Sequence, residues 1–210
     1  MIGERMKDKD KFLIRKPGII GEEQFRKYAV LVPLIDTPDG NFLLFEKRAN
    51  QLRRQPGEIC FPGGKLEPDE SLEKCAVRET MEELLILRQQ IEVVGPGDIF
   101  ISPFNLMVYP YLGVINVYNN TFSTDEVDEI IKIPLEFFLN QQPTRFESRL
   151  INQLPEDFPY EWIPEGENYP WAQGIYDVYF YRYGNHTIWG MTAHIVKSMV
   201  KLIDKYNLCR

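Results

Sequence analysis

The stretch of sequence that decides the fold runs from Gly64 to Glu83 and reads GKLEPDESLEKCAVRETMEE. Asp69 or Ser71 can cap a helix at this point, because short polar side chains accept hydrogen bonds from the first free backbone N–H groups. The residues that follow are strong helix formers and include no glycine or proline as far as Leu87. The sequence therefore predicts a helix that begins at Asp69 or Ser71 and continues through Leu87.

Three glutamates lie in the second half of this predicted helix, at Glu79, Glu82 and Glu83. At about 100° per residue they fall within an arc of about 100°, so the three carboxylates share one face. Their mutual repulsion costs stability unless a cation lies among them, and hard oxygen ligands favour Mg²⁺ or Mn²⁺. The alternative is a solvated acidic face, which is the more common role of a glutamate-rich helix.

The surroundings of the three glutamates favour the metal. The stretch resembles the Nudix box, G-x5-E-x7-R-E-U-x-E-E-x-G-U, in which U is aliphatic. Six fixed positions are in register, namely Gly64, Glu70, Arg78, Glu79, Glu82 and Glu83. The sequence departs from the pattern at Thr80, where an aliphatic residue is usual, and at Leu85, where glycine is usual. Because that glycine would supply a left-handed cap, the helix is expected to continue further or to end differently.

The resemblance implies hydrolysis of a nucleoside diphosphate linked to another group, with divalent ions on the diphosphate and water attacking phosphorus. Glu79, Glu82 and Glu83 would bind Mg²⁺ or Mn²⁺, and Glu79, Arg78 and Glu83 would be catalytic. Arg78 would orient a glutamate by pairing with Glu70 or Glu79. A purely structural role for Arg78 is an equal alternative, since an arginine clamp shapes a loop as readily as it serves a reaction.

The general base stays open between two regions of the sequence. Members of this family take the base either from the box or from a distant loop, and Glu79 is our first choice. Glu126 and Glu129 are the loop candidates, within an acidic run that is also typical of a solvated surface.

A second motif lies immediately upstream, from Leu44 to Gly64. It is similar to the pattern of coenzyme A diphosphatases, L-L-T-x-R-S/A-x3-R-x3-G-x3-F-P-G-G, and keeps its spacing throughout. Phe45 and Glu46 depart from it, and Glu46 stands in place of threonine. The resemblance implies four substrate-binding residues, which are Arg48, Arg53, Gly63 and Gly64.

Coenzyme A carries a 3'-phosphate besides its diphosphate and so requires additional positive charge. Arg48 and Arg53, together with Arg54, could provide it. The alternative is that Arg48 and Arg53 pair with acidic neighbours such as Glu46 and Glu58.

The two motifs together imply metal-dependent hydrolysis of coenzyme A or acyl-CoA to 3',5'-ADP and (acyl-)4'-phosphopantetheine. One alternative is a Nudix hydrolase acting on another nucleoside diphosphate derivative, such as ADP-ribose or a dinucleoside polyphosphate. Another is a non-catalytic Nudix domain that senses a nucleotide, although the intact glutamates argue against it.

The rest of the chain predicts strands interleaved with helices, an α/β pattern. Strands are expected at 28–35, 41–45, 58–61, 91–94, 106–117 and 176–183, turns at 36–40 and 184–186, and helices at 134–140 and 192–206. Segment 125–133 is ambiguous, Pro110 indicates an edge or bulge, and Gly63-Gly64 predicts a tight loop. The Nudix resemblance implies an α/β/α sandwich with a mixed sheet and a loop-helix-loop catalytic motif.

We expect one domain over residues 1–210, with an N-terminal extension at 1–24 and an irregular excursion at 141–175 that includes one hairpin. The formal net charge of −7 disfavours nucleic acid as a partner, and no apolar run is long enough for a membrane span. Three isolated cysteines fit a reducing cytoplasm. The expected partner is a small nucleotide substrate, and a homodimer is left open.

Overall fold

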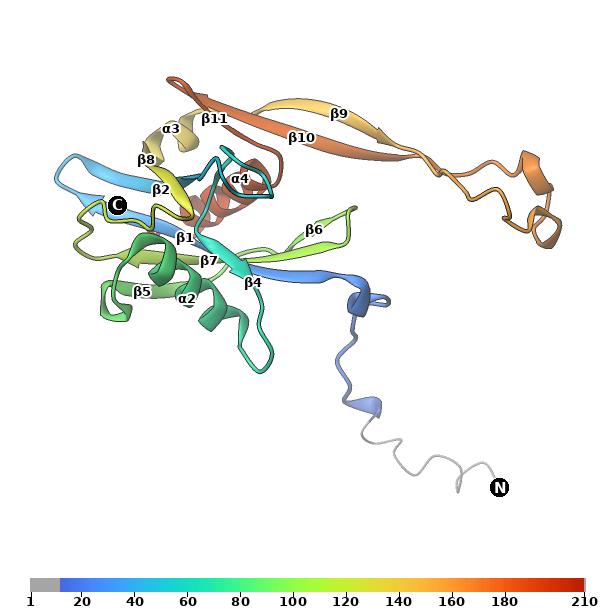
Figure 1. Ribbon diagram of the computed structural model, residues 1–210, viewed down its shortest axis with the longest axis horizontal. Coiled ribbons are helices and arrows are strands. Elements are labelled where there is room, and N and C mark those ends of the chain that lie inside the picture. The colour runs from blue at the N-terminus through green and yellow to red at the C-terminus, as the bar shows by residue number, and fades with distance from the viewer. Residues whose placement is uncertain (1–11, 210) are drawn as a thin grey trace.

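The computed structural model describes residues 12–209 and is built around a mixed eight-stranded sheet (Figure 1). Its strands follow the order β3-β2-β1-β7-β5, while β8 pairs with β2, β4 with β1 and β6 with β7. The β1–β7 pair is parallel and the other pairs are antiparallel. The strands are β1 (Arg26–Thr37), β2 (Gly40–Arg48), β3 (Ile59–Cys60), β4 (Gly63–Lys65), β5 (Ile91–Pro96), β6 (Phe100–Ser102), β7 (Leu106–Ile115) and β8 (Val127–Pro134).

Helices cover both faces of this sheet, because successive strand residues point to opposite sides. Leu44 packs in one core cluster with Val77 of α2, whereas its neighbour Phe45 packs in another with Met199 of α4. The helices are α2 (Leu72–Leu84), α3 (Leu135–Asn140) and α4 (Gly190–Lys205). The predicted α/β/α sandwich with a mixed sheet is therefore confirmed.

The box helix ends earlier than predicted, at Leu84 instead of Leu87. Leu85 adopts the left-handed conformation (φ 51°, ψ 48°), and its N–H donates to the Met81 carbonyl oxygen. The leucine thus supplies the cap that glycine usually supplies in this box, at the steric cost of a Cβ atom in that conformation.

Leu85→Gly is expected to raise the free energy of unfolding by up to about 1 kcal/mol. Relief of roughly 1–2 kcal/mol of left-handed strain exceeds the roughly 0.5–1 kcal/mol that glycine loses in backbone entropy. Urea denaturation followed by tryptophan fluorescence measures the change. Leu87→Gly is the matched control, since Leu87 is also exposed but has a φ of −89°, and it should lose stability. Equal losses in both variants would show that Leu85 is not strained.

Several other element boundaries differ from the predictions. Gly63–Lys65 forms a short strand instead of a tight loop, because its backbone pairs with β1. Segment 125–133 proves to be a strand, β7 ends at Ile115, and Pro134 precedes α3 as its N-cap. Pro110 lies in the inner strand β7, at the point where the partner of that strand changes from β6 to β5. Neither β6 nor β5 pairs with Pro110, so proline's lack of an N–H is tolerated there.

The predicted irregular excursion at 141–175 is largely a β-hairpin arm. β9 (Thr144–Leu150) and β10 (Gly174–Tyr183) project from the body, and β11 (His186–Trp189) completes a second sheet (Figure 1). Only the tip between them is irregular, with the short 3₁₀ helices η4 (Tyr160–Trp162) and η5 (Gly166–Asn168).

At the N-terminus, the described part of the predicted extension is mostly exposed and contains η2 (Glu22–Gln24), while residues 1–11 lie outside the description. Between residues 12 and 209, no helix has the length and apolar character that crossing a membrane requires.

Candidate active site

The box helix presents its acidic residues around one arginine. Ser71 caps the helix, with its Oγ accepting from the Lys74 N–H. Arg78 donates from Nε and one Nη to both Glu70 oxygens, at 2.9 and 3.1 Å, and from its other Nη to Glu79 at 2.9 Å and Glu82 at 3.4 Å. These hydrogen bonds lower the pKa of Glu70 and raise that of Arg78. Arg78 therefore makes both of the pairings that were considered for it.

Glu83 points in another direction, toward the glycines that precede the box. It is only 4% exposed, and its Oε2 accepts from the Gly63 N–H at 2.8 Å. Burial raises the pKa of Glu83, and the charge of Glu46 adds to the shift. The pKa of Glu79 is also raised, mainly by burial, although Arg78 opposes this.

Gly63 and Gly64 are glycines for steric reasons. A Cβ on Gly63 would lie 2.4 Å from the Ala29 carbonyl oxygen, and one on Gly64 would lie 2.2 Å from the Glu79 carboxylate. Both glycines also line the cavity described next. Gly63 thus lets β4 lie directly against β1, and Gly64 lets the Glu79 carboxylate of α2 lie directly against β4.

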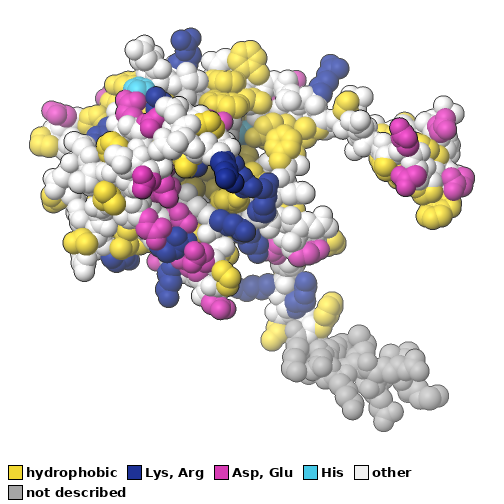
Figure 2. Space-filling view, in the orientation of Figure 1, with side chains coloured by type: hydrophobic (Ala, Val, Ile, Leu, Met, Phe, Trp, Pro, Cys, Tyr) yellow, Lys and Arg dark blue, Asp and Glu magenta, His cyan; other side chains and the backbone are white. Residues whose placement is uncertain are grey.

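A cavity of about 750 Å³ opens beside these glycines. Its charged lining residues include Glu79, Glu83 and Glu126 together with Arg26, Arg48 and Arg54. Figure 2 shows basic side chains gathered next to an acidic group over the hollow part of the molecule. The remaining wall is largely apolar and comes from β6, β7 and the turn between them, from β10 and β11, and from the start of α4. Its members include Phe100, Phe104, Leu106, Val108, Tyr176, Val178, Trp189, Met191 and Ile195.

The predicted substrate-binding arginines separate in the structure. Arg48, at the end of β2, lines the cavity, and its Nε donates to the Arg54 carbonyl oxygen at 3.4 Å. Arg54 lines the cavity as well, whereas Arg53 does not. Among residues 12–209, none of the three forms an ion pair within 4.0 Å, so the alternative pairing with Glu46 or Glu58 is absent. Arg48 and Arg54 therefore line the same cavity as Glu79, Glu83 and Glu126, and so does Arg26, which also forms no ion pair among the described residues.

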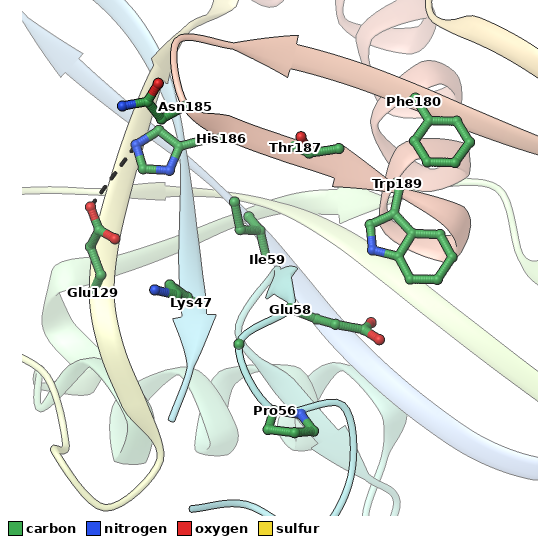
Figure 3. Close-up of a pocket in the computed structure, with 11 residues that line it drawn as sticks. Lys47, Pro56, Glu58, Ile59, Glu129, Phe180, Asn185, His186, Thr187 and Trp189 are labelled. Carbon is green, nitrogen blue, oxygen red and sulfur yellow. Dashed lines mark ion pairs between the residues drawn. The ribbon is translucent and has the colours of Figure 1, made fainter. Parts of the chain in front are cut away.

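The loop before β8 brings Glu126 to the site. The Ser123 N–H donates to the Glu83 carbonyl oxygen at 2.8 Å, and the Ala49 N–H donates to the Glu126 carbonyl oxygen at 2.9 Å. These bonds tie the loop to both motifs, and Glu126 lines the cavity. Glu129 instead lines a separate pocket of about 640 Å³, where it lies 4.0 Å from Nε2 of His186 (Figure 3).

Glu46 does not line the cavity but acts electrostatically on Glu83, and the sequence assigned it no catalytic or metal-binding role. It lies on β2, is 1% exposed, and is opposite Cys60 in the strand pairing. Burial is the main cause that raises its pKa, to about 7. The only sign in the sequence that Glu46 is unusual is its place at a threonine position of the upstream motif. Nothing in that motif showed that the carboxylate would be buried.

The carboxylates of this site suit a divalent cation chemically. Within residues 12–209, no three His, Cys, Asp or Glu side chains are placed so that they hold a metal ion as they stand. Glu79 and Glu82 are engaged by Arg78, which supplies the only direct ionic contacts to the box glutamates among the described residues. Glu83 and Glu46 are buried without an ion pair, and Oε2 of Glu46 has no hydrogen-bond partner. Buried carboxylates in this condition fit a positively charged ligand.

Comparison with known proteins agrees with this geometry. The family model described as the NUDIX domain matches residues 25–167. The chain is 35% identical over 134 residues to the mouse protein named peroxisomal coenzyme A diphosphatase NUDT7, covering 63% of this chain and 56% of that protein. It is 32% identical over 181 residues to the uncharacterized Nudix hydrolase NudL of Yersinia pestis (strain Pestoides F), covering 85% of this chain and 80% of NudL.

A solved structure shares the fold as well. The MutT/nudix family protein from Enterococcus faecalis superposes with a TM-score of 0.51 at 18% identity, over 96% of this chain and 71% of that one.

Proposed function

Because the chain belongs to the Nudix family, we propose that it hydrolyses the diphosphate bond of coenzyme A or acyl-CoA, giving 3',5'-ADP and (acyl-)4'-phosphopantetheine. The observation that carries this proposal is the single cavity that joins Glu79 and Glu83 of the box, several basic side chains and a long apolar wall. The name of the mouse relative, a coenzyme A diphosphatase, supports the same substrate.

The cavity matches the two chemical halves of this substrate. Coenzyme A has a nucleotide half with three phosphates and a pantetheine half that ends in a thiol or an acyl chain. Arg48 and Arg54 line the cavity and would bind the phosphates, since a guanidinium group can donate two hydrogen bonds to phosphate oxygens. The apolar wall from Phe100 to Ile195 is available to the tail. The volume of about 750 Å³ is within the usual range of ligand pockets.

The proposed cofactor is Mg²⁺ or Mn²⁺, held by Glu79, Glu82 and Glu83. When bound, it neutralises the diphosphate charge and lowers the pKa of a bound water. Arg78 is a positioning residue in this proposal, since its bonds to Glu70 and Glu79 fix the direction of the Glu79 carboxylate. Glu83 is fixed in the same way by the Gly63 N–H.

The general base must reach the attacking water from the cavity wall. Glu79 stays our first choice, and Glu126 is the second because the loop places it on the same wall. Glu129 lines the other pocket and lies outside this set (Figure 3).

Arg54→Ala is expected to raise KM for coenzyme A about 10- to 100-fold and to change KM for dephospho-CoA much less. The reason is that one charge-assisted contact to a phosphate is worth about 1.5–3 kcal/mol. Steady-state kinetics with both substrates make the comparison. Arg53→Ala is the matched control, since Arg53 carries the same charge on the same loop but does not line the cavity. Equal effects of the two variants would remove the support for a 3'-phosphate contact at Arg54.

A Nudix hydrolase of different specificity is the alternative for the same carboxylates, and a substrate panel separates the two. The cytoplasmic location and the homodimer stay predictions, and the mouse relative is named as peroxisomal.

A further inference from the structure

Glu46 is buried like a core residue, yet its side chain is a carboxylate, which can bind a cation. It lies on β2 between Cys60 of β3 and Ile130 of β8 and is 1% exposed. Its neighbour Phe45 packs on the α4 side of the sheet, so Glu46 faces the other side, where α2 lies. The side chain is therefore directed toward the box helix.

The contacts of the carboxylate leave half of it without a partner. Oε1 is 3.5 Å from Sγ of Cys60, and a thiol is a weak hydrogen-bond donor. Oε2 is buried and has no hydrogen-bond partner among residues 12–209. Arg48 is near enough to favour the negative charge but forms no ion pair with it. A buried carboxylate in this state is costly unless a further partner is present.

The neighbouring charges identify what that partner must be. Glu46 is the charge that Glu83 feels most strongly, ahead of Glu79 and Glu126. Glu79, Glu83 and Glu126 line the cavity, and Glu46, which does not line it, still acts on Glu83 electrostatically. Among these four carboxylates, the only ionic contact comes from Arg78, on Glu79, in the part of the chain that the structure describes. A divalent cation would reduce the repulsion between Glu46 and Glu83 and would give the unpartnered oxygen a partner.

We propose that Glu46 supplies a further carboxylate oxygen to the divalent-cation site formed by Glu79, Glu82 and Glu83. This inference rests on the metal-dependent part of the proposed function and is independent of the substrate. It explains the acid at a position where the upstream motif has threonine. A threonine or glutamine could also contact Cys60, so that contact alone does not require a charge.

Isothermal titration of the purified protein with Mn²⁺ in the absence of substrate tests this inference, together with thermal unfolding with and without Mn²⁺. Glu46→Gln is expected to weaken the Mn²⁺ affinity about 10-fold or more. The same variant should unfold at a higher temperature than the wild type when metal is absent, because a buried repulsion is removed, and should gain less from added Mn²⁺. Glu46→Thr provides a second, smaller replacement if the glutamine variant folds poorly.

Glu129→Gln is the matched control, because Glu129 lies on the neighbouring strand β8 but lines the other pocket. Its Mn²⁺ affinity should equal that of the wild type. An unchanged affinity in both Glu46 variants, or a lower unfolding temperature without metal, would overturn the inference and leave the proposed hydrolysis intact. Wild-type protein that binds Mn²⁺ through Glu46 but leaves coenzyme A uncleaved would overturn the substrate proposal alone. Wild-type protein without any Mn²⁺ binding would overturn both.

Discussion

Glu83→Gln is expected to lower kcat by about 10²- to 10³-fold while the protein stays folded. Glu83 is buried at the cavity wall and held by the Gly63 N–H, so its charge is fixed where the proposed cation acts. Glutamine keeps the size and the hydrogen bond but removes that charge, and loss of one preorganised electrostatic contact costs about 10²–10³-fold in rate. Steady-state kinetics with Mg²⁺ and with Mn²⁺ measure the effect.

Glu73→Gln on the same helix is the control for this variant. Glu73 is exposed and lies outside the cavity, so its removal should change kcat by less than about twofold. Circular dichroism of both variants should match the wild type. A Glu83→Gln enzyme within tenfold of wild-type kcat would contradict a catalytic metal site at the box and would favour a nucleotide sensor.

The metal-free protein is expected to lose stability as the pH rises from about 5 to about 8. Burial raises the pKa of Glu46 to about 7 and raises the pKa of Glu83 in the same direction, whereas both groups have values near 4.5 when unfolded. In this window the folded state holds protons that the unfolded chain has released. Each such proton lowers the free energy of unfolding by up to about 1.4 kcal/mol per pH unit, so Glu46 alone should cost about 2–3 kcal/mol and Glu83 should add to the loss.

Urea denaturation in EDTA at several pH values measures this trend. Glu70 affects stability in the opposite direction, because Arg78 lowers its pKa and its stabilising effect is lost as the pH falls. That loss occurs below about pH 5 and so does not mask the trend. Saturating Mn²⁺ should reverse the slope, since the cation binds the deprotonated carboxylates. Stability in EDTA that stays constant or rises between pH 5 and pH 8 would contradict the buried, unpaired state of Glu46 and Glu83.

The central part of this fold could be predicted from the sequence, because the local residue pattern and the box indicate the same strand, turn and helix. The strand at 28–35, the turn at 36–40 and the helix after Ser71 all follow from residues that act on their own neighbourhood. The bidentate bond between Arg78 and Glu70 follows in the same way, from the spacing of the box.

The remainder depended on tertiary contacts that the residue pattern does not contain. Leu85 ends the helix in a conformation that leucine rarely adopts, held by its bond to Met81. Glu126 and Glu129 are close in the sequence, yet the loop bonds to α2 place only Glu126 on the cavity.

Two further features share this origin. The arm formed by β9 and β10 pairs segments that are far apart in the chain, which periodicity alone does not reveal. Burial of Glu46 likewise results from strands β3 and β8 closing on both sides of β2.

Mass spectrometry of the products formed from coenzyme A tests the account most directly. The purified protein would be incubated with coenzyme A and Mg²⁺ or Mn²⁺, beside parallel reactions in EDTA and with ADP-ribose or a dinucleoside polyphosphate. We predict 3',5'-ADP and 4'-phosphopantetheine in equal amounts, only with metal present and without comparable turnover of the other substrates. Intact coenzyme A alongside cleaved ADP-ribose or dinucleoside polyphosphate would contradict the account.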